Sequence, residues 1–176
     1  MKDQTRSMIL AGTAAILLSA TPAMAQVKWS SSAITGMLHI GPVNTVTCDI
    51  GCIHGRGVRL APGFIGTAYI YLPVNLPNLT PISWLRLRAE DNHPDAVVRA
   101  DLFRQPNSFP VGGAELVTTV ATANLAGDGF QFVMSPFLVH AIATNTHSYY
   151  VRITIKRGAA AAAAACQPTA YDVSLH

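Results

Sequence analysis

The stretch SYYVRITIK, residues 148–156, decides the fold class because its side chains alternate in character from one position to the next. One alternate set is apolar: Tyr149, Val151, Ile153 and Ile155. The intervening set carries polar groups: Tyr150, Arg152, Thr154 and Lys156. Successive side chains of a strand point to opposite faces, so this period of two predicts a strand with one face on a core and the other toward water.

The same period of two recurs along the chain. It appears in ISWLRLRA (82–89), DAVVRADLF (95–103) and GFQFVMS (129–135), while TAYIYLPV (67–74) and AELVTTVATA (114–123) are rich in β-branched or aromatic residues. Clusters of Gly, Pro and Asn separate these segments. Short strands joined by such turns predict an all-β protein, an antiparallel two-sheet sandwich of jelly-roll-like type with about eight strands. A single closed β-barrel is the alternative.

One segment departs from the alternation. GAAAAAAAC (158–166) contains a run of alanines between the strand that ends near Lys156 and the terminal YDVSLH. Alanine favours helix, but an isolated helix shorter than about 12 residues is marginal in water. We therefore expect 158–168 to form the loop of a last hairpin.

The first 25 residues indicate the compartment. Lys2 and Arg6 precede the apolar run MILAGTAAILLS (8–19), and ATPAMA (20–25) ends in small residues. This order predicts a secretory signal peptide cleaved after Ala25, since the run is too short for a membrane span. We therefore expect 26–176 to form a single β-sandwich domain without a transmembrane segment, in the periplasm or secreted.

After this leader, the chain contains YLPVNLPNLTPISWLRLRAEDN, then an L-F-R strand, SYYVRITIKR and a closing AYDVSLH. In this strand pattern it resembles small exported bacterial β-sandwich domains of uncharacterised function. It covers about residues 65–176. It implies the sandwich fold and brings no catalytic or binding residue with it.

Charge is sparse. Charged residues make up 12% of the chain, about half of the usual fraction of roughly 25%. The chain holds 12 basic and 9 acidic residues, and Lys2, Arg6 and Asp3 lie in the leader, which leaves ten and eight. This balance argues against nucleic acid, which requires a clustered basic surface. Weak charge repulsion also favours self-association, so a homo-oligomer is expected.

Three cysteines suggest a disulfide, because thiols outside the cytoplasm tend to be oxidised. Cys48 and Cys52 lie about 13 Å apart if their segment is extended, whereas a disulfide joins Cα atoms about 4.4–6.8 Å apart. Their pairing therefore requires a turn, which Gly51 favours. The alternative pairs one of them with Cys166.

The stretch CDIGCIHGRG (48–57) also raises a metal hypothesis. Cys48, Cys52 and His54 offer soft thiolates and an imidazole, which suit copper or zinc. The Cys-x3-Cys-x-His spacing matches no standard zinc motif. A periplasmic metal binder is therefore an alternative function.

The outward faces of two predicted strands carry aromatic and basic side chains. Trp84, Arg86 and Arg88 share one side of their strand, and Tyr150 and Arg152 share one side of theirs. If the two strands are neighbours, they form a patch suited to sugar rings and anionic polymers, and thus to a polysaccharide or protein partner. If the two strands are not neighbours, the outward side of each is an ordinary solvated sheet face.

Catalytic motifs do not occur in the sequence. It has no G-x-S-x-G, H-E-x-x-H, phosphate-binding loop or dinucleotide fingerprint. Its two glutamates are Glu90 and Glu115, and its six histidines are scattered. We therefore predict an exported, non-enzymatic module with a structural or ligand-binding role and no cofactor. A small hydrolase whose site assembles only in space is a second alternative.

Overall fold

The structure of the chain is a computed structural model, which describes residues 26–39, 46–49, 57–60, 63–91, 93–108, 113–122, 129–160 and 168–176. These residues contain one short 3-10 turn, η1 (Ala33–Thr35), and thirteen strands. The strands are β1 (Trp29–Ser32), β2 (Met37–His39), β3 (Val46–Asp49), β4 (Gly57–Leu60), β5 (Gly66–Val74), β6 (Pro81–Ile82), β7 (Leu85–Glu90), β8 (Ala96–Pro106), β9 (Glu115–Ala121), β10 (Phe130–Met134), β11 (His140–Ala141), β12 (His147–Arg157) and β13 (Thr169–Leu175). They outnumber the predicted eight because several have only two to four residues.

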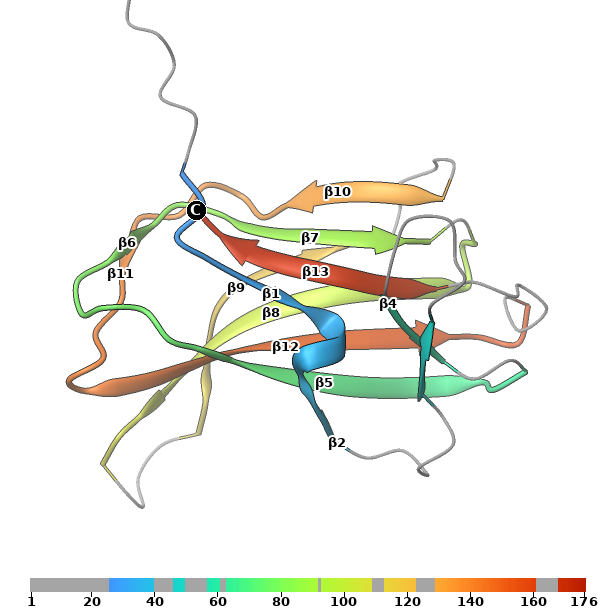
Figure 1. Cartoon of the computed structure of the whole chain (residues 1–176), viewed down its shortest axis with the longest axis horizontal. Coiled ribbons are helices and arrows are strands. Elements are labelled where there is room, and N and C mark those ends of the chain that lie inside the picture. Colours follow the sequence, from blue (N-terminus) through green and yellow to red (C-terminus); the bar gives the residue numbers. More distant parts are fainter. Residues whose placement is uncertain are drawn as a thin grey trace, which may run out of the picture.

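The strands form two main antiparallel layers, which Figure 1 shows one above the other. The six-stranded sheet has the order β10-β7-β13-β4-β3, with β1 also beside β13. The five-stranded sheet has the order β2-β5-β12-β8-β9, and β6 and β11 form a small separate pair. The predicted sandwich is confirmed. The sheets of the described residues end in edge strands rather than closing, so the barrel alternative was wrong.

Strand β12 organises the five-stranded sheet. It pairs with β5 on one side and with β8 on the other along nearly its whole length. Its inward residues Val151, Ile153 and Ile155 are fully buried, as the alternation of SYYVRITIK predicts. Residues from both layers join them in one core: Ala68, Ile70, Leu72, Val98, Ala100, Leu102, Leu85, Leu87, Val173 and Leu175. Each Val, Leu or Ile side chain among them contributes about 1.5–3 kcal/mol through its burial.

The chain crosses from one layer to the other near its first described strands. β1 pairs with β13 in the six-stranded sheet, and β2 pairs with β5 in the five-stranded sheet. Gly36 lies at this crossing, where a Cβ atom would overlap the Cγ2 of Ile70. The close approach therefore requires glycine at this position.

The predicted last hairpin was wrong. β12 belongs to the five-stranded sheet and β13 to the six-stranded sheet, so the segment between them joins the two layers. Alternation marks each strand but does not show which sheet it joins, because partners in a sandwich are set by packing across distant parts of the chain.

The C-terminus lies beside the first described residues (Figure 1). The backbone N–H of Lys28 donates to the carbonyl of Leu175 over 2.7 Å, and the register continues along β1 and β13. Among the described residues, no helix has both the length and the apolar character needed to cross a bilayer.

Candidate functional site

Among the described residues, the outer face of the five-stranded sheet carries a group of aromatic and charged side chains in mutual contact. Three neighbouring strands supply it, and their register places Arg152 of β12 between Tyr71 of β5 and Asp101 of β8. We call this group the aromatic–arginine face. Its members are Tyr69, Tyr71, Asp101, Phe103, Tyr150 and Arg152.

Arg152 is fixed at the centre of this face. The Cζ of its guanidinium lies 4.7 Å from the ring centre of Phe103 and 5.5 Å from that of Tyr69. Its Nη2 donates to Asp101 Oδ2 over 2.9 Å. Burial lowers the pKa of the Arg152 guanidinium, but Asp101 and, to a smaller extent, Tyr71 raise it, so this pKa lies above its ordinary value. Two ring contacts and an ion pair restrict the rotation of the group.

Tyr150 extends the aromatic surface along β12. Its ring stacks on Phe103 with a centroid distance of 5.3 Å and meets Tyr71 at 5.7 Å. Burial and the neighbouring Tyr71 raise the pKa of the Tyr150 phenol, and the charge of Arg152 opposes that shift. The hydroxyl therefore stays neutral at physiological pH and is able both to donate and to accept hydrogen bonds.

Asp101 neutralises part of the positive charge. It is 2% exposed, and its Oδ1 accepts a hydrogen bond from Thr119 over 2.7 Å. Its Oδ2 accepts from Arg152 and from Arg99, whose Nε and Nη2 both lie at 3.1 Å. Three of these four contacts fall on Oδ2 and one on Oδ1, so Oδ2 is the oxygen that neutralises the two arginines.

The two halves of the patch expected from sequence do not meet. Tyr150 and Arg152 lie on β12, whereas Arg86 and Arg88 lie on β7 of the other sheet. Trp84 precedes β7 and contacts Phe137 edge to face at 5.2 Å. The strands β7 and β12 are therefore not neighbours, and the five residues do not form one patch.

Arg86 and Arg88 form a separate group on the six-stranded sheet. Arg86 lies 5.8 Å from the ring centre of Phe132, and Arg88 lies 5.7 Å from that of Phe130. Arg88 also pairs with Asp172 over 2.6 Å. Burial raises the pKa of Asp172 while the two arginines oppose that shift. Both arginines therefore contact side chains of their own six-stranded sheet.

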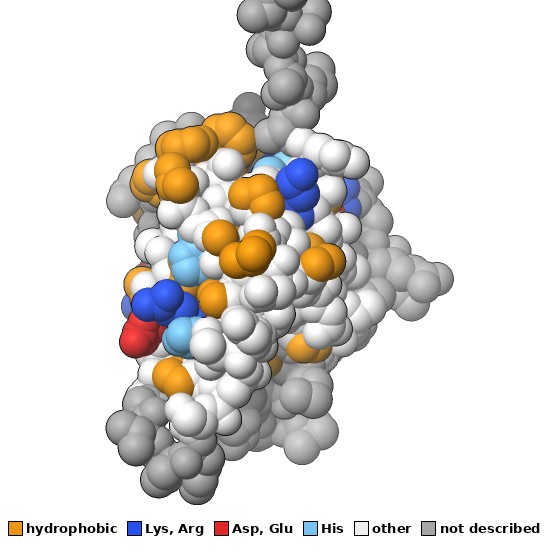
Figure 2. Space-filling view, turned by 90° about the vertical axis from the view of Figure 1, so that its left-hand side faces the viewer, with side chains coloured by type: hydrophobic (Ala, Val, Ile, Leu, Met, Phe, Trp, Pro, Cys, Tyr) orange, Lys and Arg blue, Asp and Glu red, His pale blue; other side chains and the backbone are white. Residues whose placement is uncertain are grey.

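Apolar side chains are exposed along β10 and the segment that follows it. The exposed fractions are 59% for Phe132, 50% for Met134, 64% for Phe137 and 91% for Val139. Figure 2 shows several hydrophobic side chains at the surface on this end of the molecule. Such a patch agrees with the expectation of self-association, which stays a prediction.

The cysteine hypotheses fall largely outside the described residues. Cys48 lies on β3, where its backbone pairs with Val58, but its side chain is not described. Cys52, His54 and Cys166 lie outside the described ranges. The described part of the chain contains no group of three or more His, Cys, Asp or Glu that could hold a metal.

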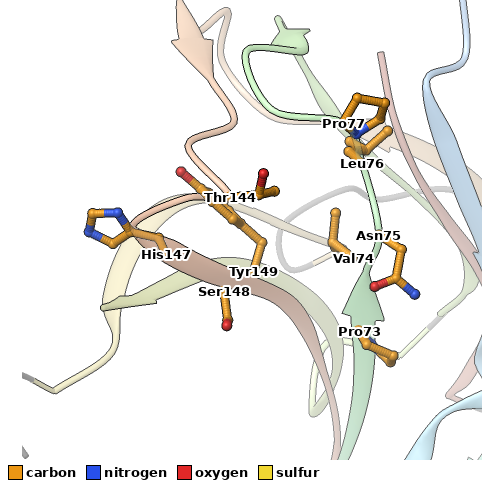
Figure 3. A pocket seen from close by; sticks show the side chains of 9 residues that line it. All are labelled: Pro73, Val74, Asn75, Leu76, Pro77, Thr144, His147, Ser148 and Tyr149. Carbon is orange, nitrogen blue, oxygen red and sulfur yellow. The ribbon is translucent and has the colours of Figure 1, made fainter. Parts of the chain in front are cut away.

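A pocket of about 590 Å³ lies where β5 and β12 separate. Figure 3 shows Tyr149 and Thr144 on one side of it, Val74, Leu76 and Pro77 on the other, and His147 pointing away. This volume is within the range of roughly 300–1,000 Å³ for small-ligand sites. Five of its nine lining residues have polar side chains, but none is an arginine, lysine or carboxylate, so it lacks the charged groups of the aromatic–arginine face.

Behind this pocket, Tyr149 joins a hydrogen-bond network. Its hydroxyl accepts from the N–H of Ala143 over 3.2 Å. The same hydroxyl shares a hydrogen bond with His140 Nε2, which lies 3.1 Å away. Burial, followed by the charges of Arg104 and His147, lowers the pKa of His140. Arg104 is itself paired with Glu115 over 2.6 Å.

This network predicts a pH effect. The pKa of His140 is lower in the folded protein than in the unfolded chain. Neutral His140 therefore contributes to stability above its ordinary pKa, and this contribution is lost as the pH falls through the pKa of the folded state. Chemical unfolding should therefore show less acid destabilisation for His140→Gln than for the unchanged protein between about pH 7 and pH 5.5. His93→Gln, in the turn before β8, is the matched control and should retain the unchanged protein's pH dependence. Equal slopes for all three proteins would contradict the prediction.

Sequence reasoning missed four members of the face: Tyr69, Tyr71, Asp101 and Phe103. A signal was present in TAYIYLPV, where Thr67, Tyr69, Tyr71 and Pro73 alternate with apolar residues. What the sequence does not show is that β5 and β8 flank β12, which brings these residues together with Tyr150 and Arg152.

No protein-family model and no curated protein matches the chain. Among solved structures, a β-1,3-glucan-binding CBM6 from Bacillus halodurans is similar, with 11% identity and a TM-score of 0.46 over 84% of this chain and 92% of that one. An exo-β-1,3-galactanase from Phanerochaete chrysosporium, in a crystal structure with galactose, has 13% identity and a TM-score of 0.42 over 84% of this chain. The likeness spans only 29% of that galactanase. None of these similarities assigns a ligand to the present chain.

Proposed function

We propose that the protein is an exported, non-catalytic module that binds carbohydrate through the aromatic–arginine face. The observation that carries this proposal is the fixed guanidinium of Arg152 between aromatic rings on an outer sheet face. Three of the chain's five tyrosines belong to this face, and Tyr69, Tyr71 and Tyr150 are all partly exposed. The outer face of a sandwich is usually covered by solvated polar residues, so this concentration of rings favours a ligand.

The chemistry of the face suits a sugar. Aromatic rings pack against the apolar C–H surface of a pyranose, and phenol hydroxyls and guanidinium N–H groups hydrogen-bond its oxygens. Because Arg152 is already ordered by Phe103, Tyr69 and Asp101, little of its conformational entropy is lost when a ligand binds. An open face of this kind accommodates a chain more readily than it encloses a small molecule.

The binding proposal is tested with single variants and a panel of immobilised polysaccharides. Tyr150→Ala and Arg152→Ala should each weaken binding at least about tenfold, which corresponds to about 1.4 kcal/mol. Arg152→Lys keeps the charge but loses the planar fork, so it should also bind more weakly. Affinity is measured by titration calorimetry after circular dichroism confirms that each variant is folded.

Trp84→Ala is the matched control, because it removes an aromatic side chain outside the five-stranded sheet. It should change the affinity less than about twofold. Loss of binding in Trp84→Ala with retention in both β12 variants would contradict the proposal. So would a panel in which no polysaccharide binds the unchanged protein.

Export is tested separately by the intact mass of the full chain expressed in a bacterial host. We expect the recovered protein to begin at Gln26 and to gain mass on reduction, because one disulfide forms among Cys48, Cys52 and Cys166. A product that retains the leader, or one with three free thiols, would contradict this part of the proposal.

A further inference from the structure

Positive charge predominates on the outer face of the five-stranded sheet. The described charged residues that face outward from β8 and β12 are Arg99, Asp101, Arg152 and Lys156. Arg99 and Lys156 are exposed, whereas Asp101 is buried. Glu115 on the neighbouring β9 is held by Arg104 at 2.6 Å. The four outward groups therefore carry three positive charges against one negative charge.

The only carboxylate among these four groups, Asp101, is buried, with 2% of its surface exposed. Asp101 receives Thr119 on one oxygen and both arginines on the other. The guanidinium groups remain partly accessible, with side-chain exposures of 44% for Arg99 and 26% for Arg152. At these four groups, an approaching ligand thus meets accessible charged donors, whereas the one charged acceptor is buried.

This imbalance distinguishes between classes of sugar. A neutral sugar offers hydroxyls that both donate and accept, so a face of charged donors satisfies only part of its hydrogen bonding. Carboxylate and sulfate groups only accept, and they form the strongest hydrogen bonds with arginine. Lys156 lies four residues beyond Arg152 on the same side of β12, about 13 Å along the strand. A polysaccharide with repeated acid groups is able to contact both Arg152 and Lys156.

On this basis, and resting on the proposed function, we propose that the aromatic–arginine face binds an acidic polysaccharide, carboxylated or sulfated, whose acid groups lie along β12 between Arg152 and Lys156. The rings of Tyr150 and Phe103 contact the sugar, and the cations contact its acid groups. A lipid surface fits less well, because recognition of anionic lipid typically uses clusters of about four to eight basic residues.

The experiment compares matched ligands that differ only in charge. The pairs are polygalacturonate with its methyl ester, and dextran sulfate with dextran, together with phosphatidylglycerol vesicles. The unchanged protein should bind the charged member of at least one pair at least about tenfold more tightly than the neutral member. That preference should shrink as salt is added, because exposed charges are screened.

Two variants test the assigned residues. Lys156→Gln and Arg99→Gln should each weaken binding of the charged ligand about threefold to tenfold, while binding of the neutral member changes little. Lys28→Gln removes the same charge from an exposed position beside the six-stranded sheet, and it should bind as the unchanged protein does. An equal loss in Lys28→Gln would overturn the assignment to this face.

The remaining outcomes separate the two proposals. Equal affinity for charged and neutral members would leave carbohydrate binding in place and overturn the acidic preference. Failure to bind any polysaccharide would overturn both. Tighter binding to phosphatidylglycerol vesicles than to any polysaccharide would replace the acidic polysaccharide with an anionic lipid surface.

Discussion

Replacing Asp101 by alanine should lower the free energy of unfolding by about 2–3 kcal/mol. The carboxylate is nearly inaccessible, at 3% side-chain exposure, and it holds Arg99, Arg152 and Thr119. Its loss leaves two guanidinium groups beside each other without a counter-charge. Because both are partly exposed, water screens them, and the loss stays below the roughly 3–5 kcal/mol found for fully buried pairs.

Urea unfolding of Asp101→Ala, Asp101→Asn, Arg99→Ala and the double variant of Asp101→Ala with Arg99→Ala measures this effect. Asp101→Asn keeps the shape and some acceptor capacity, so its loss should be smaller. Adding Arg99→Ala to Asp101→Ala should recover part of the stability, since it removes one unpaired charge. If the effects of Asp101→Ala and Arg99→Ala on the free energy of unfolding simply add in the double variant, the two residues do not interact, which would contradict the prediction.

Shortening Ile153 to alanine should destabilise the sandwich by about 2–5 kcal/mol. Ile153 is fully buried, and its backbone pairs with Ile70 on β5 and Ala100 on β8. The midpoint of thermal unfolding should fall by about 2–4 °C for each kcal/mol lost. Ile153→Val, which removes a single carbon, should cost about 0.5–1.5 kcal/mol.

The next residue on the strand gives the contrasting control. Thr154 faces the opposite side, is 7% exposed, and its Oγ1 has no hydrogen-bond partner among the described residues. Thr154→Val keeps the branched shape and removes a buried hydroxyl, so it should leave stability unchanged or raise it by about 1 kcal/mol. Similar losses at both positions would contradict the assignment of Ile153 to the core and Thr154 to the outer face.

Alternation alone predicted the strands well. SYYVRITIK, 148–156, lies within β12 (His147–Arg157), and TAYIYLPV, 67–74, lies within β5 (Gly66–Val74). In both strands one face is apolar throughout, so the pattern reports burial directly. The prediction for 82–89 was less accurate at its start, because β6 and β7 are separate strands on either side of Ser83 and Trp84.

The aromatic–arginine face was only partly predictable because it depends on which strands are neighbours. Tyr150 and Arg152 were identified, but they were grouped with Trp84, Arg86 and Arg88, which lie on or next to β7 of the other sheet. In a sandwich, adjacent strands come from distant parts of the chain, and local sequence carries little information about that order. Asp101 illustrates the same limit, since its three partners come from β8, β9 and β12.

The central claim is that ligand binds on β12 and its neighbours in the five-stranded sheet, and mapping of backbone amide shifts by NMR tests it most directly. Titration with a polysaccharide that binds should shift the amides of Tyr71, Phe103 and residues 150–154. Residues 86–88 on the other sheet should stay unchanged. Shifts confined to β7 and β10, or to the pocket beside Thr144 and Tyr149, would contradict the account.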